Sequence, residues 1–145
     1  MARLRRPELT GTLVLDAEGI IKLARGNVEA RARARQAYRR GSAVVTGAAT
    51  LAEILRGGPR DTPLHRALAK IKVIPIESQQ GRAAGELLGR TGLSGHRCAL
   101  DALLAVIALD QPRPVVVLTS DPKDLGRLTE EPGRPRAERV KVVRV

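Results

Sequence analysis

The stretch VVVLTSDPKDL, residues Val115 to Leu125, decides the fold. Its aliphatic run is too short for a helix, so it indicates a buried strand, and it stops at the carboxylate of Asp121. The stretch TLVLDAEGI, Thr12 to Ile20, repeats this pattern near the start of the chain, where the aliphatic run breaks at Asp16. Strands of this kind that are followed by helices are typical of a parallel sheet, whose functional groups gather where the strands end.

Short aliphatic runs alternate with helical segments along the rest of the chain. Strands are predicted at residues 12–16, 42–47, 72–76, 114–120 and 138–145. Helices are predicted within residues 18–26, 27–41, 48–58, 61–71, 78–92, 96–110 and 121–133, with Asn27, Asp61 and Ser78 as N-caps. This alternation predicts one α/β domain over residues 12–145, with helices on both faces of a parallel sheet, preceded by a basic arm at residues 1–11.

Composition narrows the classes of partner. The 145 residues carry a formal charge of +11, which favours a nucleic acid as the ligand, although Arg-rich usage in a GC-rich genome would give the same balance. The chain has one Tyr and neither Trp nor Phe, which argues against RNA-binding modules that stack bases on aromatic rings.

The cellular compartment is predicted from three weaker signals. The single cysteine, Cys98, allows no intramolecular disulfide, which suits a reducing cytosol. The first residues lack the apolar core of a signal peptide, and the longest apolar stretch is too short to span a membrane. We therefore expect a cytoplasmic protein with no membrane association.

Two more acids stand inside apolar helices, Glu53 in ATLAEIL and Asp101 in LDALLAVIA. Carboxylates in such surroundings are costly unless they are paired or coordinate a metal, and each strand-end Asp on its own is explained equally well as a helix N-cap. If the four acids face one another, a divalent cation would relieve their repulsion, and oxygen ligands suit Mg²⁺ or Mn²⁺. His65, His96 and Cys98 are too scattered for a zinc site.

The four segments TLVLDAEGI, ATLAEIL, LDALLAVIA and VVVLTSDPKDL, in this order, resemble the PIN-domain nucleases and, among them, the VapC-like toxins of bacterial toxin–antitoxin modules. The resemblance runs from about residue 12 to 145 and implies a three-layer α/β/α fold with strand order 3-2-1-4-5. In that order the strands that end at Asp16 and Asp121 are neighbours. One departure is Cys98, which stands where some members carry an extra acid, so a second metal site is expected to be weaker unless Cys98 is simply a small buried hydrophobe.

The resemblance implies a metal-dependent endoribonuclease whose catalytic residues are Asp16, Glu53, Asp101 and Asp121. Asp16, Asp101 and Asp121 would hold Mg²⁺ or Mn²⁺, and Glu53 would orient or deprotonate the attacking water. The family further implies cleavage of an RNA substrate to a 5′-phosphate and a 3′-hydroxyl, a cognate antitoxin protein as partner, and a homodimer.

Other residues have two interpretations each. Thr119 and Ser120 either bind a phosphate or the carboxylates, or merely cap the strand end, and Asp124 is either a supporting acid or a surface residue. Arg31, Arg35 and Arg39 recur every four residues, so they form either a phosphate-binding stripe or a solvated face.

Two other functions fit the same sequence less well. A basic PIN-like domain that binds RNA without cutting it would gain nothing from four acids. A receiver or phosphatase domain needs a second acid at the first strand and a placed Lys, and the segment LVLDAEG offers only Asp16 and Glu18.

Overall fold

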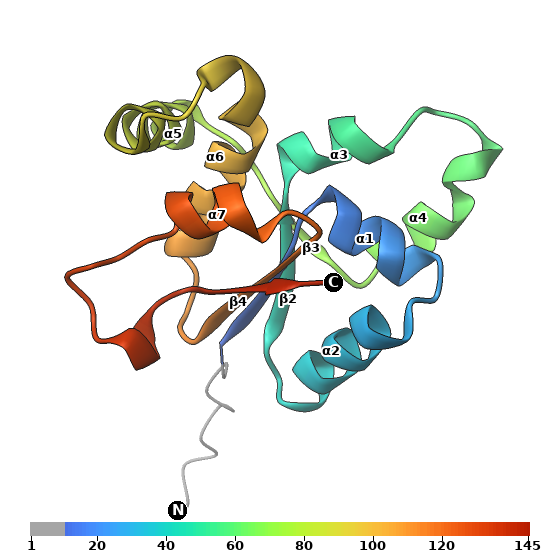
Figure 1. Cartoon of the computed structure of the whole chain (residues 1–145). Coiled ribbons are helices and arrows are strands. Elements are labelled where there is room, and N and C mark those ends of the chain that lie inside the picture. The colour runs from blue at the N-terminus through green and yellow to red at the C-terminus, as the bar shows by residue number, and fades with distance from the viewer. Residues whose placement is uncertain (1–10) are drawn as a thin grey trace, which may run out of the picture.

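The structure, a computed structural model, describes residues 11–145 (Figure 1). The basic arm predicted for residues 1–11 therefore lies outside the described residues, except for Gly11. The elements in chain order are β1 (Thr12–Leu15), α1 (Ala17–Ala24), α2 (Val28–Arg39), β2 (Ala43–Gly47), α3 (Ala48–Ile54), η1 (Pro59–Asp61), α4 (Thr62–Leu68), β3 (Lys72–Ile74), α5 (Ser78–Thr91), α6 (Gly95–Leu109), β4 (Val115–Thr119), α7 (Pro122–Leu128), η2 (Arg136–Glu138) and β5 (Lys141–Arg144).

The five strands form one parallel sheet in the order β3-β2-β1-β4-β5, which confirms the predicted fold class and strand order. The register pairs Leu15 of β1 with Leu118 of β4, so these two strands end side by side. The strands that follow β1 in the sequence, β2 and β3, are added on one side of it, and β4 and β5 are added on its other side. The crevice at this reversal, beyond the strand ends, is where ligands bind in folds of this kind.

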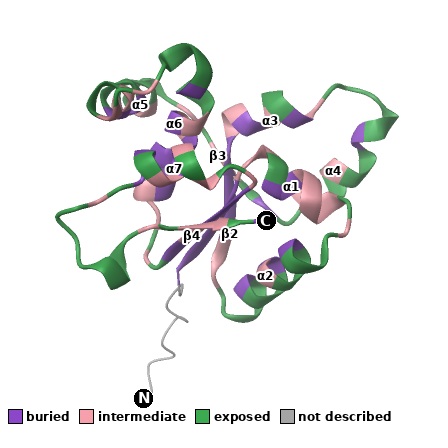
Figure 2. Ribbon diagram, viewed as in Figure 1, coloured by how far each residue is buried: buried purple, intermediate pink, exposed green. Residues whose placement is uncertain are grey.

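Helices cover both faces of the sheet, as Figures 1 and 2 show. Because side chains alternate along a strand, Val14 and Val117 face the layer of α5, α6 and α7, whereas Leu13 and Leu15 face the layer of α1, α2 and α4. The inner strands β1 and β4 are buried on both faces, which explains why their sequences are almost continuously aliphatic.

Helix α6 is the most buried helix, as its apolar sequence predicts. Ala102, Ala105 and Ala108 are fully buried, and Leu104 and Ile107 are nearly so. The small side chains let α6 lie close to the sheet, where Ile107 approaches the backbone of Gly47 so closely that a side chain there would meet it. Among residues 11–145, no single helix is long and apolar enough to cross a membrane, and only α5 and α6 together, bent by 119°, reach that length and composition.

The predicted N-caps have different outcomes. Asn27 accepts a hydrogen bond from the Ala30 N–H, at 2.9 Å, and caps α2 as predicted. Asp61 occupies the N-cap position of α4 as predicted, but its side chain makes no capping hydrogen bond, because the carboxylate accepts from the N–H groups of Arg56 and Gly57, both at 2.8 Å. Ser78 is not the cap of α5 either, since Glu77 occupies that position and its N–H is bound by the side chain of Gln80.

The last strand begins later than predicted, at Lys141. The residues before it form the turn η2 and are held by Glu131, whose two carboxylate oxygens each accept a hydrogen bond from the Arg113 guanidinium at 2.6 Å. Glu131 also accepts from the Val140 N–H, at 3.4 Å. This long-range pair joins the loop that enters β4 to the loop that enters β5.

Candidate active site at the carboxyl ends of β1 and β4

Asp16 and Asp121 are both placed by the turn from a strand into a helix. Asp16 follows β1 in an extended conformation, and its Oδ1 accepts a hydrogen bond from the Gly19 N–H, at 2.7 Å. Asp121 follows β4, and its Oδ1 accepts from the Lys123 N–H, at 3.4 Å. Both acids are therefore N-caps, and because β1 and β4 are neighbours they also lie at the same end of the sheet, where folds of this kind bind their ligands.

Thr119 connects these two acids. Its hydroxyl oxygen accepts a hydrogen bond from the Asp121 N–H, at 3.0 Å, and the side chain is only 1% exposed. The same side chain is hydrogen-bonded to Asp16, which lowers the pKa of Asp16, although burial of the carboxyl outweighs this and raises the pKa overall. Ser120 is half-buried, and its side chain forms no hydrogen bond with the other residues that the structure describes.

Asp101 lies in the second turn of α6. Its pKa is raised to about 6, chiefly by burial and in addition by the negative charges of Asp16, Asp124 and Asp121. These three carboxylates are therefore near enough to Asp101 to oppose its ionisation. Asp101 is half-buried, which agrees with the expectation drawn from its apolar helix.

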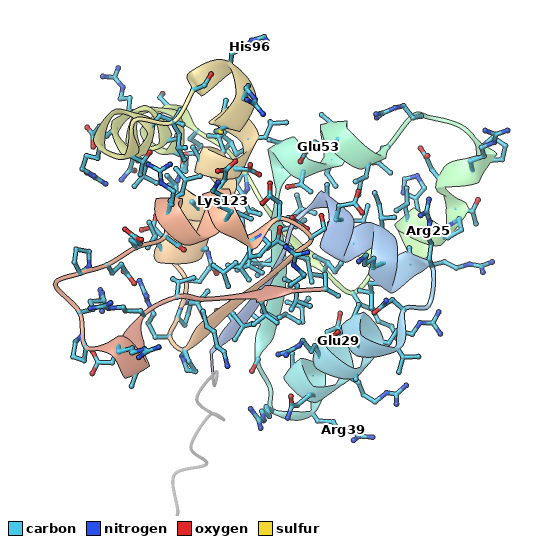
Figure 3. The ribbon with its side chains drawn as sticks, viewed as in Figure 1. Arg25, Glu29, Arg39, Glu53, His96 and Lys123 are labelled. Carbon is cyan, nitrogen blue, oxygen red and sulfur yellow. The ribbon has the colours of Figure 1, made fainter. Side chains whose placement is uncertain are left out.

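Glu53 differs from that expectation, because it is exposed. It lies on α3, which follows β2 directly, and Figure 3 shows it on the same side of the molecule as the other strand ends. Partial burial raises the pKa of Glu53, and the charges of Asp101 and Asp16 raise it further. Solvent screens an exposed carboxylate, so Glu53 belongs to the cluster at its rim.

Asp124 is half-buried and faces the cluster, so it is more than a surface residue. Its Oδ2 lies 3.8 Å from the Cys98 Sγ, which donates to it, and its charge contributes to the raised pKa of Asp101. Cys98 is buried at 6% exposure, and burial together with the charges of Asp124 and Asp101 raises the pKa of its thiol. Asp124 thus brings a fifth carboxylate next to Cys98.

The donor atoms suit a hard divalent cation, since they are carboxylate oxygens whose charges are uncompensated. Within residues 11–145, however, no three His, Cys, Asp or Glu side chains already stand close enough together to hold a metal ion. Asp16 accepts hydrogen bonds from the Gly19 N–H and the Thr119 side chain, and Asp121 accepts from the Lys123 N–H.

The arginines predicted to hold RNA lie elsewhere. Arg39 is at the end of α2 that leads into the start of β2, whereas the acids follow the ends of the strands, and Figure 3 shows Arg39 well separated from Glu53. Arg31 and Arg35 line a groove toward α4. The α2 arginines are therefore not brought together with the acids, because the helix runs back along the sheet.

Two cations lie nearer to the acids. Lys123 is exposed and follows Asp121 by two residues at the start of α7 (Figure 3). Arg97 is exposed on α6, and its charge opposes the rise in the pKa of Cys98. The sequence did not single out either residue, because an isolated Lys or Arg in a basic chain carries no pattern.

The sheet order, the two helical layers and the strand-end acids together define a PIN-like α/β fold. No protein-family model and no curated protein matches the sequence. Among solved structures, the chain is similar to a chain in the crystal structure of VapBC2 from Rickettsia felis bound to a DNA fragment from its promoter, with 15% identity over 91% of this chain and 98% of that chain and a TM-score of 0.63. It is also similar to a chain in a toxin–antitoxin complex from Klebsiella pneumoniae, with 21% identity over 90% of this chain and 95% of that chain and a TM-score of 0.59. The resemblance to VapC-like toxins is thus confirmed at the level of the fold.

Proposed function

We propose that the chain is a metal-dependent endoribonuclease and the toxin of a toxin–antitoxin pair. The observation that carries the proposal is the meeting of Asp16, Asp101 and Asp121, with Glu53 at the rim, beyond the ends of β1 and β4. These residues come from four elements that are distant in sequence. A cluster of like charges that raises the pKa of its own members destabilises the fold, and such clusters are typical of functional sites.

Asp16, Asp101 and Asp121 would hold Mg²⁺ or Mn²⁺, which when bound would neutralise phosphate charge and acidify a water molecule. Glu53 would orient or deprotonate the attacking water, a role that suits an exposed carboxylate with a raised pKa. Thr119 would fix the positions of Asp16 and Asp121 through its buried hydroxyl. Asp124 would support the same set from the side of Cys98.

The proposal of an antitoxin partner rests on the two solved structures of similar fold, which are toxin–antitoxin complexes. We infer that this chain likewise binds a cognate antitoxin protein, and that it forms a homodimer and acts in the cytoplasm. A net charge of +11 supports RNA as the substrate, since it attracts a polyanion without regard to sequence.

One observation favours a second candidate, a PIN-like domain that binds RNA without cutting it. The acids of residues 11–145 are not already arranged around one point, so a cation would have to draw them together. In a protein that only binds, the acids would stay apart in the presence of Mg²⁺ or Mn²⁺.

Cleavage of RNA distinguishes the two candidates. We expect the purified chain to cut single-stranded RNA with Mg²⁺ or Mn²⁺ and to be inactive in EDTA. Asp16→Asn should abolish cutting while RNA retention in a gel-shift assay persists. The matched control is Asp110→Asn, which makes the same change at the exposed C-cap of α6, at the other end of that helix from the site. Cutting that survives EDTA would overturn the mechanism, and retention without cutting under either metal would identify the binding domain.

A further inference from the structure

Two exposed cations, Arg97 and Lys123, stand beside the carboxylate cluster. Arg97 is in the first turn of α6, four residues before Asp101, so both side chains lie on one face of that helix. Lys123 is in the first turn of α7, two residues after Asp121. Each cation is therefore placed next to a different acid of the candidate metal site.

A contact between the sequence neighbours of these cations joins the two helices. The Cys98 Sγ donates to the Asp124 Oδ2 at 3.8 Å, and Cys98 and Asp124 directly follow Arg97 and Lys123 in the sequence. The charge of Arg97 also acts on the Cys98 thiol and lowers its pKa, against the larger effect of burial. Arg97 and Lys123 therefore flank the junction of α6 and α7, at the edge of the cluster.

The charged groups of both cations are free within residues 11–145. No ion pair or hydrogen bond from this part of the chain engages the Arg97 guanidinium or the Lys123 ammonium. Neither charge is among the causes that act on the pKa of Asp101, although Asp101 lies one turn from Arg97. If the two cations served only to neutralise the cluster, we would expect them to pair with its carboxylates. Their charges are instead presented to solvent.

Glu53 approaches the cluster from the opposite side. It lies on α3, which follows β2, whereas α7 follows β4, and β1 lies between these two strands. Lys123 and Glu53 therefore come from different sides of Asp16, which follows β1, and Figure 3 shows them on separate helices. The site thus has an acidic side at α3 and a cationic side at the junction of α6 and α7.

We propose that Arg97 and Lys123 bind the RNA phosphates that adjoin the scissile bond, so that the strand lies along the α6–α7 side of the site. This inference rests on the proposed function and names the residues that hold its substrate. A bound divalent cation would satisfy the carboxylates, which leaves the two side-chain cations for phosphate groups outside the cluster. An Arg can bind a phosphate through two N–H groups, and a Lys binds it as a point charge.

The composition of the chain agrees with a strand that is held by its backbone. Proteins that bind single-stranded RNA through its bases generally stack them on aromatic rings. The chain has one such ring, Tyr38, whose hydroxyl donates to the Lys70 carbonyl at 2.6 Å on the far side of the molecule from the acids. Because phosphate contacts carry no sequence information, Arg97 and Lys123 should contribute equally to the binding of strands of different base composition.

RNA binding is measured in a Glu53→Gln background, which removes the proposed base but none of the proposed metal ligands. Fluorescence anisotropy follows the binding of U-only and A-only strands of about 12 nucleotides over a range of KCl concentrations. Mn²⁺ is kept far below the KCl concentration, so that K⁺ dominates the counterions. Circular dichroism of each variant establishes that it is folded.

Three variants are compared in that background. The decisive variant adds Arg97→Gln and Lys123→Gln. The matched control adds Arg39→Gln and Lys72→Gln, which removes one exposed Arg and one exposed Lys where β2 and β3 begin, at the opposite end of the sheet. The third variant, Arg97→Lys with Lys123→Arg, keeps both charges.

The expected change follows from the release of counterions. Each phosphate contact with a single strand contributes about 0.7 to the slope of log affinity against log salt, so the loss of two contacts should reduce the slope by about 1.4. At about 0.1 M KCl this corresponds to about 25-fold weaker binding, for the U-only and the A-only strand alike. The control should keep the slope and lose less than about threefold in affinity, and the charge-retaining variant should keep the slope of the background.

Cleavage by the chain with Glu53 intact gives a second measurement. In single-turnover experiments, Arg97→Gln with Lys123→Gln should raise the concentration that gives half the maximal rate by the same factor and change the maximal rate less. This is the result expected for groups that bind the substrate and the transition state equally. A chain that does not cut RNA at all would refute the proposed nuclease, and the binding comparison would still decide the role of the two cations.

Four results would overturn the inference. Equal loss of affinity in the decisive variant and the control would show that RNA senses only the net charge. An unchanged slope together with a lower free energy of unfolding in urea would show that the two cations serve the acids. A reduced slope in the charge-retaining variant would show a structural role. A loss confined to one base composition would show contacts to bases instead of phosphates.

Discussion

Replacing Asp101 with Asn should stabilise the protein at neutral pH in the absence of divalent cations. Asp101 has a folded-state pKa of about 6, above the ordinary aspartate value of 3.8, because burial and the charges of Asp16, Asp124 and Asp121 oppose its ionisation. A carboxyl with a raised folded-state pKa favours folding below the unfolded-state pKa, and this contribution is lost as the pH rises through the folded-state pKa. Ionised Asp101 therefore lowers the free energy of unfolding above about pH 6.

The size of the stabilisation by Asp101→Asn follows from the pKa shift of Asp101. The difference between 3.8 and about 6 corresponds to about 3 kcal/mol, at about 1.4 kcal/mol per pKa unit. Asp101 is half-buried and partly screened by solvent, so we expect about 1–2 kcal/mol. For a domain of this size that gain raises the melting temperature by about 3–6 °C.

Urea denaturation at pH 4 and at pH 7.5, with EDTA or with Mg²⁺, measures this difference. In EDTA, the Asn variant should exceed the wild type in free energy of unfolding at pH 7.5, and the gap should close toward pH 4. Adding Mg²⁺ should reverse the order, because a cation at a hundredfold excess over its Kd stabilises the wild type by about 2.7 kcal/mol and the variant by less. A variant that is no more stable than the wild type at pH 7.5 in EDTA would refute the electrostatic reasoning.

Two further substitutions test neighbouring parts of the structure. Thr119→Val removes the hydroxyl whose hydrogen bond lowers the pKa of Asp16, so the acidic limb of the pH–cleavage profile should move to higher pH. Thr46→Val is the control, because it removes a buried hydroxyl that binds the Leu15 carbonyl and not an acid, and an equal shift in that variant would contradict the assignment. Glu131→Gln disrupts the paired hydrogen bonds to Arg113 and should cost about 1–3 kcal/mol of unfolding free energy at pH 7 in urea denaturation. The Arg113 guanidinium lowers the pKa of Glu131, so this stability is present above the unfolded-state pKa and is lost as the pH falls through the folded-state pKa. The cost should therefore shrink in strong acid, and a constant cost would indicate a packing effect.

Most of the fold could be predicted because its signals are local and repeated. Each buried strand is a continuous aliphatic run, and each is followed by a helix with a recognisable period, which leaves a parallel sheet as the consistent solution. Asp16 and Asp121 stood out because each interrupts such a run. Their closeness depends on the strand order, which the sequence implied only through its resemblance to a family.

The features that were not predicted depend on contacts between distant segments or on competition among neighbours. Asp61 is a good N-cap by type, but two free N–H groups in the preceding turn bind its carboxylate instead. Glu77 caps α5 in place of Ser78 because Gln80 can complete the capping box with it. Glu53 was expected to be buried, yet α3 is a short helix at the rim of the crevice, and such a helix buries only one face.

The carboxylate cluster and the arginines of α2 lie in different parts of the molecule. This separation helps to distinguish a nuclease from a domain that only binds RNA. The pKa of Asp101 is raised to about 6 by burial and by the charges of three carboxylates, and no cation of the described residues is among the causes that act on it. Solvent and salt screen charges beyond about 8–10 Å, so only cations close to the cluster can compensate it. Lys123 and Arg97 are two such cations among the described residues, and we propose that a bound divalent cation supplies the rest. Because we propose that RNA is retained by cations outside the cluster, Asp16→Asn should leave retention intact, and only cleavage should depend on the acids.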